Sequence, residues 1–170
     1  TCRDWSSDVC SSDLLYELVK RYAALTGAET VLDLYCGTGT IGIYLSDAAR
    51  SVTGIEIVES AVSDARRNCR INGIGNCRFL AGDIRGLLSQ VAEKPRVMII
   101  DPPRAGMHPD VVRQVVEMAP PRIVYVSCNP ATLARDLALM ADRYEVAEVQ
   151  PVDMFPHTFH IESVARLIRK

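Results

Sequence analysis

The sequence lacks the features that would indicate a membrane protein, a secreted protein or a metal protein. No apolar stretch approaches the roughly 18 residues of a membrane span, and the N-terminus shows no basic-then-apolar signal pattern. Six cysteines are present but contain no C-x-x-C pair, the spacing typical of zinc and redox sites. We therefore expect a cytoplasmic protein with reduced thiols and no metal.

An excess of positive charge is also missing. The chain has 19 lysines and arginines against 21 aspartates and glutamates, a net charge of −2. A protein that binds RNA normally carries a basic patch. The charge balance therefore argues against a complete RNA-binding enzyme.

A single domain fits the length of 170 residues, since 48% hydrophobic content is enough for one sizeable core. Residues 1–14 differ from the rest, being rich in serine and aspartate without helical or strand periodicity. The run from Asp4 to Leu14 resembles the translation of a sequencing-adapter oligonucleotide. We expect residues 1–14 to be a non-native or disordered tail and residues 15–170 to be the domain.

Helical and extended patterns alternate from residue 15 onward. The first helix, 15–25, is expected to end with Gly27 as its C-cap. Further helices are predicted at 41–49, 60–72, 109–118 and 131–141, and strands at 30–35, 52–57, 77–81, 96–100, 123–126, 145–151 and 163–168. This alternation predicts an α/β fold with a mostly parallel, doubly wound sheet, whose ligands bind at the carboxyl ends of the strands.

A glycine loop follows the first predicted strand. Gly37-Thr38-Gly39-Thr40-Ile41-Gly42 fits G-x-G-x-x-G, and Glu56 comes nineteen residues after Gly37. Alone, this is the fingerprint of a dinucleotide site, and a weak one. Asp33 precedes the loop inside an otherwise apolar strand, where a carboxylate is costly to bury unless it meets a partner. The loop therefore predicts a nucleotide-type cofactor.

Cys128 stands where a parallel strand would meet its ligand. It follows the apolar run 123–126 within Ser127-Cys128-Asn129-Pro130. Pro130 opens a predicted helix, whose dipole lowers the pKa of a thiol at its start. The cysteines at 36, 69 and 77 lie in a loop, a helix and a strand, where a free cysteine usually packs as a small hydrophobic residue. Cys128 is therefore the candidate nucleophile.

Two further motifs place charged groups at strand ends. In Asp101-Pro102-Pro103-Arg104 the prolines restrict the backbone, so the carboxylate and the guanidinium are presented rigidly. Downstream, Asp153-Met154-Phe155-Pro156-His157-Thr158 leads into His160-Ile161-Glu162. His160 and Glu162 share one face of an extended segment. A thiol, two carboxylates and a guanidinium can thus converge.

Together these ordered motifs and the glycine loop resemble the RNA uridine-5-methyltransferases, from Leu15 to Lys170. The resemblance implies a Rossmann-like class I fold that uses S-adenosylmethionine to methylate C5 of a uridine in RNA, with 23S ribosomal RNA favoured over transfer RNA. Thiolate addition at C6 makes C5 nucleophilic, which implies Cys128 as nucleophile. Glu162 would be the base that removes the C5 proton.

The resemblance also implies the binding residues. Cofactor contacts are expected from Asp33, Tyr35, Gly37, Gly39, Thr40, Glu56, Asp83 and Asp101, and substrate contacts from Arg104, Asn129 and His160. In this scheme Asp33, Tyr35 and Thr40 serve the methionine end. Glu56 takes the ribose hydroxyls, Asp83 lies near the adenine, Asp101 lies near the amino-acid or sulfonium group, and Arg104 meets the uracil edge or an RNA phosphate.

Some alternatives stay open. Amino-group methyltransferases place an aromatic residue after Asp/Asn-Pro-Pro, where this chain has Arg104, and no cysteine follows Pro103 as in 5-methylcytosine enzymes. An NAD-dependent oxidoreductase or a non-enzymatic nucleotide-binding module would share the glycine loop.

One element of the family pattern is missing from this chain. A family glutamine that contacts the cofactor has no counterpart, because residues 11–14 occupy its position. The family's RNA-binding module, with an iron–sulfur cluster in some members, would precede residue 15, and we expect a monomer.

Overall fold

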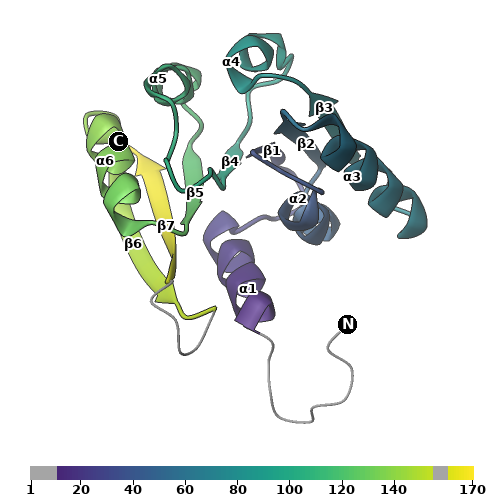
Figure 1. Cartoon of the computed structure of the whole chain (residues 1–170), viewed down its shortest axis with the longest axis horizontal. Coiled ribbons are helices and arrows are strands. Elements are labelled where there is room, and N and C mark those ends of the chain that lie inside the picture. Colours follow the sequence, from purple (N-terminus) through teal and green to yellow (C-terminus); the bar gives the residue numbers. More distant parts are fainter. Residues whose placement is uncertain (1–10, 155–160) are drawn as a thin grey trace.

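A single seven-stranded sheet organises the chain, for which the computed structural model describes residues 11–154 and 161–170 (Figure 1). The strand order is β3-β2-β1-β4-β5-β7-β6. The strands are β1 (Thr30–Leu34), β2 (Ser51–Glu56), β3 (Cys77–Ala81), β4 (Val97–Ile100), β5 (Arg122–Ser127), β6 (Tyr144–Val152) and β7 (Glu162–Arg169). Strands β1 to β5 run parallel, and β7 is antiparallel to both β5 and β6. The predicted mostly parallel, doubly wound sheet is confirmed.

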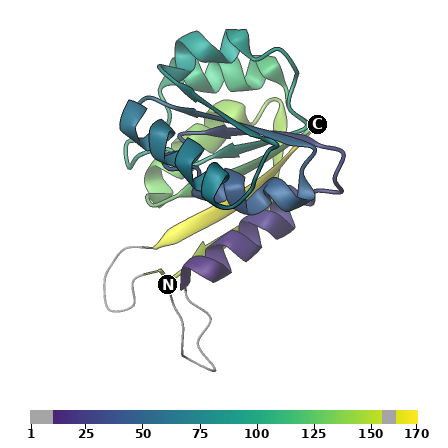
Figure 2. The ribbon, with the colours of Figure 1, turned by 90° about the vertical axis from the view of Figure 1, so that its right-hand side faces the viewer.

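Helices cover both faces of this sheet (Figure 2). They are α1 (Ser11–Ala23), α2 (Thr40–Leu45), α3 (Glu59–Ile71), α4 (Ile84–Leu87), α5 (Pro109–Met118) and α6 (Pro130–Met140), with 3₁₀ turns η1 (Ser46–Ala48) and η2 (Leu88–Gln90). Neighbouring residues of a strand point to opposite faces. Leu32 and Leu34 accordingly pack with α5 and α6, whereas Val31 packs with α1 and α2. Both faces are buried, which explains the unbroken apolar runs of the central strands.

The end of α1 differs from its prediction. The helix stops at Ala23, Ala24 takes the left-handed conformation with φ 43°, and Gly27 lies further along in the loop. Arg122 donates hydrogen bonds to the carbonyls of Ala23 and Ala24. Ala24 is itself the left-handed cap, since its N–H donates to the Lys20 carbonyl at 3.0 Å, and Arg122 satisfies its two carbonyl partners, so the helix ends without glycine. The helix also begins at Ser11, four residues before its predicted start, and α4 and η2 were not predicted.

One edge of the sheet collects the predicted motifs. The loops that follow β1 to β5 all leave from the carboxyl ends of parallel strands, so they lie along the same edge. Because β7 is antiparallel to β5, its first residues return to this edge, where Ser163 pairs with Ser127. The topology therefore brings together segments that are up to 129 positions apart, from Asp33 to Glu162.

Candidate active site

The glycine loop turns tightly between β1 and α2. Tyr35, Gly37 and Gly39 have φ values of 61°, 52° and 79°, and the Gly39 N–H donates to the Cys36 carbonyl at 2.8 Å. A Cβ atom on Gly39 would lie 2.7 Å from the Phe79 ring. Glycine is therefore required there for both conformation and space. Tyr35 is a bulky residue in a region it rarely adopts, a strain typical of functional loops.

Asp33 lies beneath this loop with its side chain fully buried. Its Oδ2 accepts the Gly42 N–H at 3.1 Å, while Oδ1 has no hydrogen-bond partner among the described residues. Burial, together with the charges of Asp101 and Glu56, raises the pKa of Asp33 to about 8. An unsatisfied buried oxygen is costly, so this atom fits a site for a polar or cationic group.

Glu56 ends β2 and contacts the glycine loop. Its Oε2 accepts the Gly37 N–H at 3.1 Å and its Oε1 accepts the Val58 N–H at 2.9 Å. A carboxylate has about four acceptor sites, so capacity for further donors remains. Glu56 therefore supports the loop and can still receive hydroxyl groups of a ligand.

An apolar hollow of about 230 Å³ lies beside these residues. Its lining includes Tyr35, Ile57, Ile84 and Asp83. Ile57 is 67% exposed, unusual for isoleucine, and Asp83 caps α4 by accepting the Arg85 N–H at 2.9 Å. The sequence interpretation included Asp83 but missed Ile57 and Ile84, although an isoleucine directly after the acidic end of β2 was a signal for an apolar contact.

Asp101 follows β4 and lies next to the end of β1, where its N–H donates to the Leu34 carbonyl at 3.3 Å. Solvent reaches the side chain, yet the protein atoms crowded around it and the charge of Glu162 raise its pKa to about 7. Two of the predicted carboxylates thus lie within each other's electrostatic field. Thr40, another predicted cofactor residue, is exposed at the start of α2.

Cys128 directly follows β5, and Glu162 begins the neighbouring strand β7. The antiparallel register of β5 and β7 pairs Ser127 with Ser163, and Cys128 and Glu162 each follow one position beyond that pair. Both side chains are half-buried. The structure thus places the predicted nucleophile and the predicted base just beyond the same end of the β5–β7 ladder, whereas His160 lies outside the described residues.

Asn129 connects the cysteine motif to the Asp101-Pro102-Pro103-Arg104 motif. Its Oδ1 accepts the Ala131 N–H at 3.0 Å as the N-cap of α6, and its Nδ2 donates to the Arg104 carbonyl at 3.1 Å. The Arg104 side chain is exposed. In this arrangement Asn129 holds the backbone that carries Arg104.

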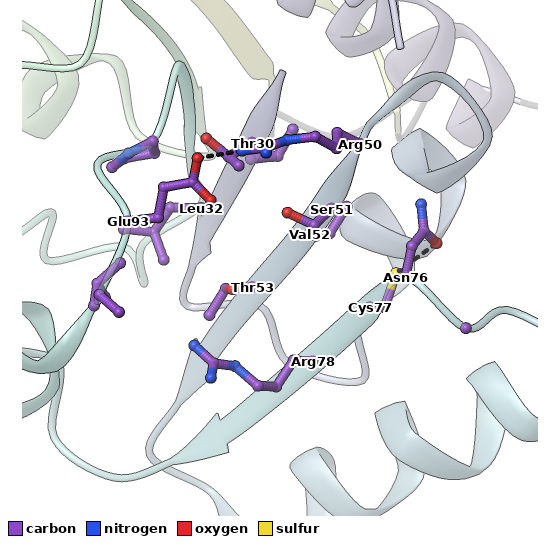
Figure 3. A pocket seen from close by; sticks show the side chains of 15 residues that line it. Thr30, Leu32, Arg50, Ser51, Val52, Thr53, Asn76, Cys77, Arg78 and Glu93 are labelled. Atoms are coloured by element: carbon purple, nitrogen blue, oxygen red, sulfur yellow. Dashed lines mark hydrogen bonds and ion pairs between the residues drawn. The ribbon is translucent and has the colours of Figure 1, made fainter. Parts of the chain in front are cut away.

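A larger hollow of about 440 Å³ lies at the opposite edge, by the amino ends of β1, β2 and β3 (Figure 3). Arg50 forms an ion pair with Glu93 there. None of the predicted site residues lines it, so the candidate active site stays at the carboxyl edge. Within the described ranges, no three His, Cys, Asp or Glu side chains are arranged to hold a metal ion, and no helix could cross a membrane.

The parallel sheet, the glycine loop and the acids at successive strand ends define a Rossmann-like methyltransferase domain. The chain belongs to the methyltransferase-domain family, whose model matches residues 31–120. Residues 92–170 match the model of the tRNA (Uracil-5-)-methyltransferases, and the predicted resemblance to the RNA uridine-5-methyltransferases is confirmed.

Similar proteins include an uncharacterized RNA methyltransferase of Enterococcus faecalis, 51% identical over 93% of this chain and 35% of the relative. Another from Bacteroides thetaiotaomicron is 54% identical over 90% of this chain and 35% of the relative. The chain thus spans about a third of these curated relatives, 35% of each.

Among solved structures, the Pyrococcus abyssi tRNA (uracil-54, C5)-methyltransferase in complex with S-adenosyl-L-homocysteine matches with a TM-score of 0.79 and 38% identity. The match covers 96% of this chain and 40% of that one. The N-methyltransferase NodS of Bradyrhizobium japonicum, at 16% identity and a TM-score of 0.78, covers 96% of this chain and 89% of that one and shares the fold alone.

Proposed function

We propose that this chain is the catalytic domain of an S-adenosylmethionine-dependent RNA (uracil-5-)-methyltransferase. The observation that carries the proposal is the register of β5 and β7, whose last pair, Ser127 with Ser163, supports a position for the Cys128 thiol near the Glu162 carboxylate at the ligand-binding edge. The names of the curated relatives support RNA as the substrate. The family model over residues 92–170 supports uracil as the target base.

The residues at the glycine loop fit S-adenosylmethionine, which supplies the methyl group when bound. The buried Oδ1 of Asp33 needs a polar partner at the proposed methionine end. Glu56 has acceptor capacity for the ribose hydroxyls, and Ile57 and Ile84 offer apolar surface to a flat base, with Asp83 beside it. The P. abyssi relative, whose structure contains S-adenosyl-L-homocysteine, supports this assignment.

In the proposed reaction, the Cys128 thiolate adds to C6 of the uracil, and the C5=C6 electron pair moves to C5, which accepts the methyl group. Glu162 then takes the proton from C5. The electron pair of that C–H bond restores the C5=C6 double bond, and the Cys128 sulfur leaves C6 as a thiolate. Arg104, exposed on the adjoining loop, is proposed to contact the uracil edge or an RNA phosphate, with His160 as a second substrate contact.

We propose a uridine of 23S ribosomal RNA as the first substrate to test. A transfer RNA is the alternative, supported by the tRNA names of the matching family model and of the P. abyssi structure. We propose that the protein acts as a cytoplasmic monomer. The RNA-binding part is proposed to lie in the two thirds of the relatives that this chain does not span, since 35% of each is covered.

The proposal is tested with RNA that contains 5-fluorouridine. Fluorine cannot leave C5 as a cation, so the Cys128–C6 bond would persist after methyl transfer. The chain is incubated with methyl-labelled S-adenosylmethionine and substituted 23S RNA fragments or transfer RNA, then run on a denaturing gel. We expect a slower, labelled band that Cys128→Ala abolishes and that the control Cys77→Ala retains. A band in Cys128→Ala, or none with either RNA for both this chain and an intact relative such as that of Enterococcus faecalis, would refute the proposal.

A further inference from the structure

Asp136 on α6 has a carboxylate that is 0% exposed and that the proposed reaction does not use. Its Oδ2 accepts the Met107 N–H at 2.8 Å and the Tyr125 hydroxyl at 2.6 Å. Its Oδ1 accepts Nε and Nη2 of Arg135 at 2.9 and 2.7 Å. A buried carboxylate is tolerated only when it is fully paired, and four donors achieve that here. The network joins β5, α6 and the loop after β4.

Arg135 binds that loop from the same side. Its Nη2 donates to the carbonyls of Ala105 and Met107 at 3.0 and 3.1 Å. Arg135 therefore holds two carbonyls of the segment while Asp136 holds an N–H. Gly106, with φ 74°, lies between them, and a Cβ there would come within 2.5 Å of Arg135 Nη2 and 2.8 Å of Asp136 Oδ2. Only glycine fits this close approach.

The start of α6 holds the backbone of Arg104, the residue before Ala105. The Arg104 carbonyl accepts hydrogen bonds from Asn129 Nδ2 at 3.1 Å and Thr132 Oγ1 at 3.2 Å. Asn129 is the N-cap of α6, and Thr132 and Asp136 lie four positions apart on one face of the helix. This face therefore holds the backbone of residues 104–107, and the helix begins two residues after Cys128.

We infer that Arg135 and Asp136 are positioning residues that hold the Arg104 loop, residues 101–107, in a fixed place relative to Cys128. The inference rests on the proposed function, in which one uracil meets both the thiol and the guanidinium. Tyr125 extends the connection to β5, three residues before Cys128. Misplacing a reacting group by about 1 Å can lower a rate about 100-fold, so the pair would set the rate of the thiol addition without touching the substrate.

Three variants test the inference. Asp136→Asn keeps the shape and an oxygen for Tyr125 and Met107, but its amide cannot pair with the Arg135 guanidinium. Gly106→Ala disturbs the contact of the loop with Arg135 and Asp136 from the loop side, and it provides the test if Asp136→Asn folds poorly. Asp142→Asn, an exposed aspartate just after α6, is the matched control.

The readout is the rate of adduct formation with saturating 5-fluorouridine RNA, below the unfolding temperature of every variant. We expect Asp136→Asn and Gly106→Ala to slow adduct formation about 100-fold, with the affinity for S-adenosylmethionine unchanged. Asp142→Asn should match the wild type. An unchanged rate in both variants, or slowing that disappears once the folded fraction is corrected, would overturn the inference.

A second measurement separates this inference from the proposed function. If neither the wild-type protein nor an intact relative forms an adduct, the proposed function fails, while amide hydrogen exchange still reports the loop. We then expect faster exchange at Met107 in Asp136→Asn than in Asp142→Asn, because its N–H acceptor is weakened. Equal exchange in the two variants would overturn the positioning role.

Discussion

The carboxylate of Glu56 accepts the backbone N–H of Gly37 at 3.1 Å, across the gap between β2 and the glycine loop. The same side chain accepts the Val58 N–H at 2.9 Å with its other oxygen. One residue therefore supports the loop and is proposed to bind the ribose of the cofactor. Removal of the Glu56 side chain should therefore weaken cofactor binding in two ways, through the loss of loop support and through the loss of the ribose contact.

Glu56→Ala is expected to lower the affinity for S-adenosylmethionine by roughly 1.5–3 kcal/mol, the range for hydrogen bonds to charged groups, or about 10- to 150-fold. Isothermal titration calorimetry on the purified chain measures the loss. Glu59→Ala, an exposed glutamate that begins α3, is the control and should bind as the wild type does. Unaltered binding in Glu56→Ala would remove Glu56 from the cofactor site.

Glu162→Gln, made at the matching position of an intact relative, should separate the two halves of the proposed reaction. Cys128 can still add to C6 and C5 can still be methylated, but an amide cannot take the C5 proton. Turnover should fall by about 10²- to 10⁴-fold, and an adduct with ordinary uridine RNA should accumulate, carrying the methyl label on a denaturing gel.

The double variant Cys128→Ala/Glu162→Gln should lack this band, since no sulfur remains to hold the base. Glu145→Gln, an exposed position on β6, should turn over normally. Normal turnover in Glu162→Gln would instead direct attention to His160 as the base.

Asp33→Asn should change how stability depends on pH. The folded state keeps the Asp33 proton up to about pH 8, whereas the unfolded chain loses it near 3.8. Between these values the folded state binds the extra proton, so this group makes stability fall as pH rises from about 4 to about 8. Asparagine carries no such proton, so Asp33→Asn should flatten the curve.

Thermal melts without cofactor, from pH 4 to 9, test this effect. At pH 8 we expect Asp33→Asn to melt at least about 3 °C above the wild type, while at pH 4 the two should be close. The melting temperature of Asp33→Asn should still fall somewhat as pH rises, because the pKa of Asp101 is also raised, to about 7. Asp64→Asn, exposed on α3, is the control. Parallel curves for Asp33→Asn and the wild type would contradict the raised pKa.

Gly54→Ala should destabilise the sheet. A Cβ at this position of β2 would lie 2.5 Å from the Phe79 ring and 2.8 Å from Cys36 Sγ. Overpacking of this kind costs about 1–3 kcal/mol, measurable by urea unfolding. Gly75→Ala, where the Cβ meets nothing within 4 Å, should change stability by less than about 0.5 kcal/mol. Equal stabilities for the two variants would show that Phe79 repacks freely.

The sequence predicted most of the fold because its patterns are local. The boundaries of β3 (Cys77–Ala81) and α5 (Pro109–Met118) coincide with the prediction. Errors arose where a distant residue contributed to the outcome, as when Arg122 binds the carbonyls of Ala23 and Ala24 at the end of α1. The four-residue helix α4 was too short to show a period.

The candidate site was predictable as a set of strand ends, since motifs after parallel strands meet at one edge. The register that sets Ser127 opposite Ser163, one position from Cys128 and from Glu162, was not predictable, because nothing local in the sequence aligns β5 with β7. Asp136 was also missed. A carboxylate on a helix ordinarily indicates a solvated face, and only the tertiary position of Met107 shows otherwise.

The strand β6 leaves one side of the sheet open, since within residues 11–154 and 161–170 it pairs with β7 alone. Its residues Glu145 to Pro151 are exposed, among them Val146 and Val149, which are 42% and 47% exposed. Such an edge invites strand-to-strand aggregation between copies. The irregularity between Val146 and Glu148 interrupts the regular ladder, and Pro151 lacks an N–H to donate. Together with the charges of Glu145 and Glu148, these features oppose the addition of a strand from another copy at this edge.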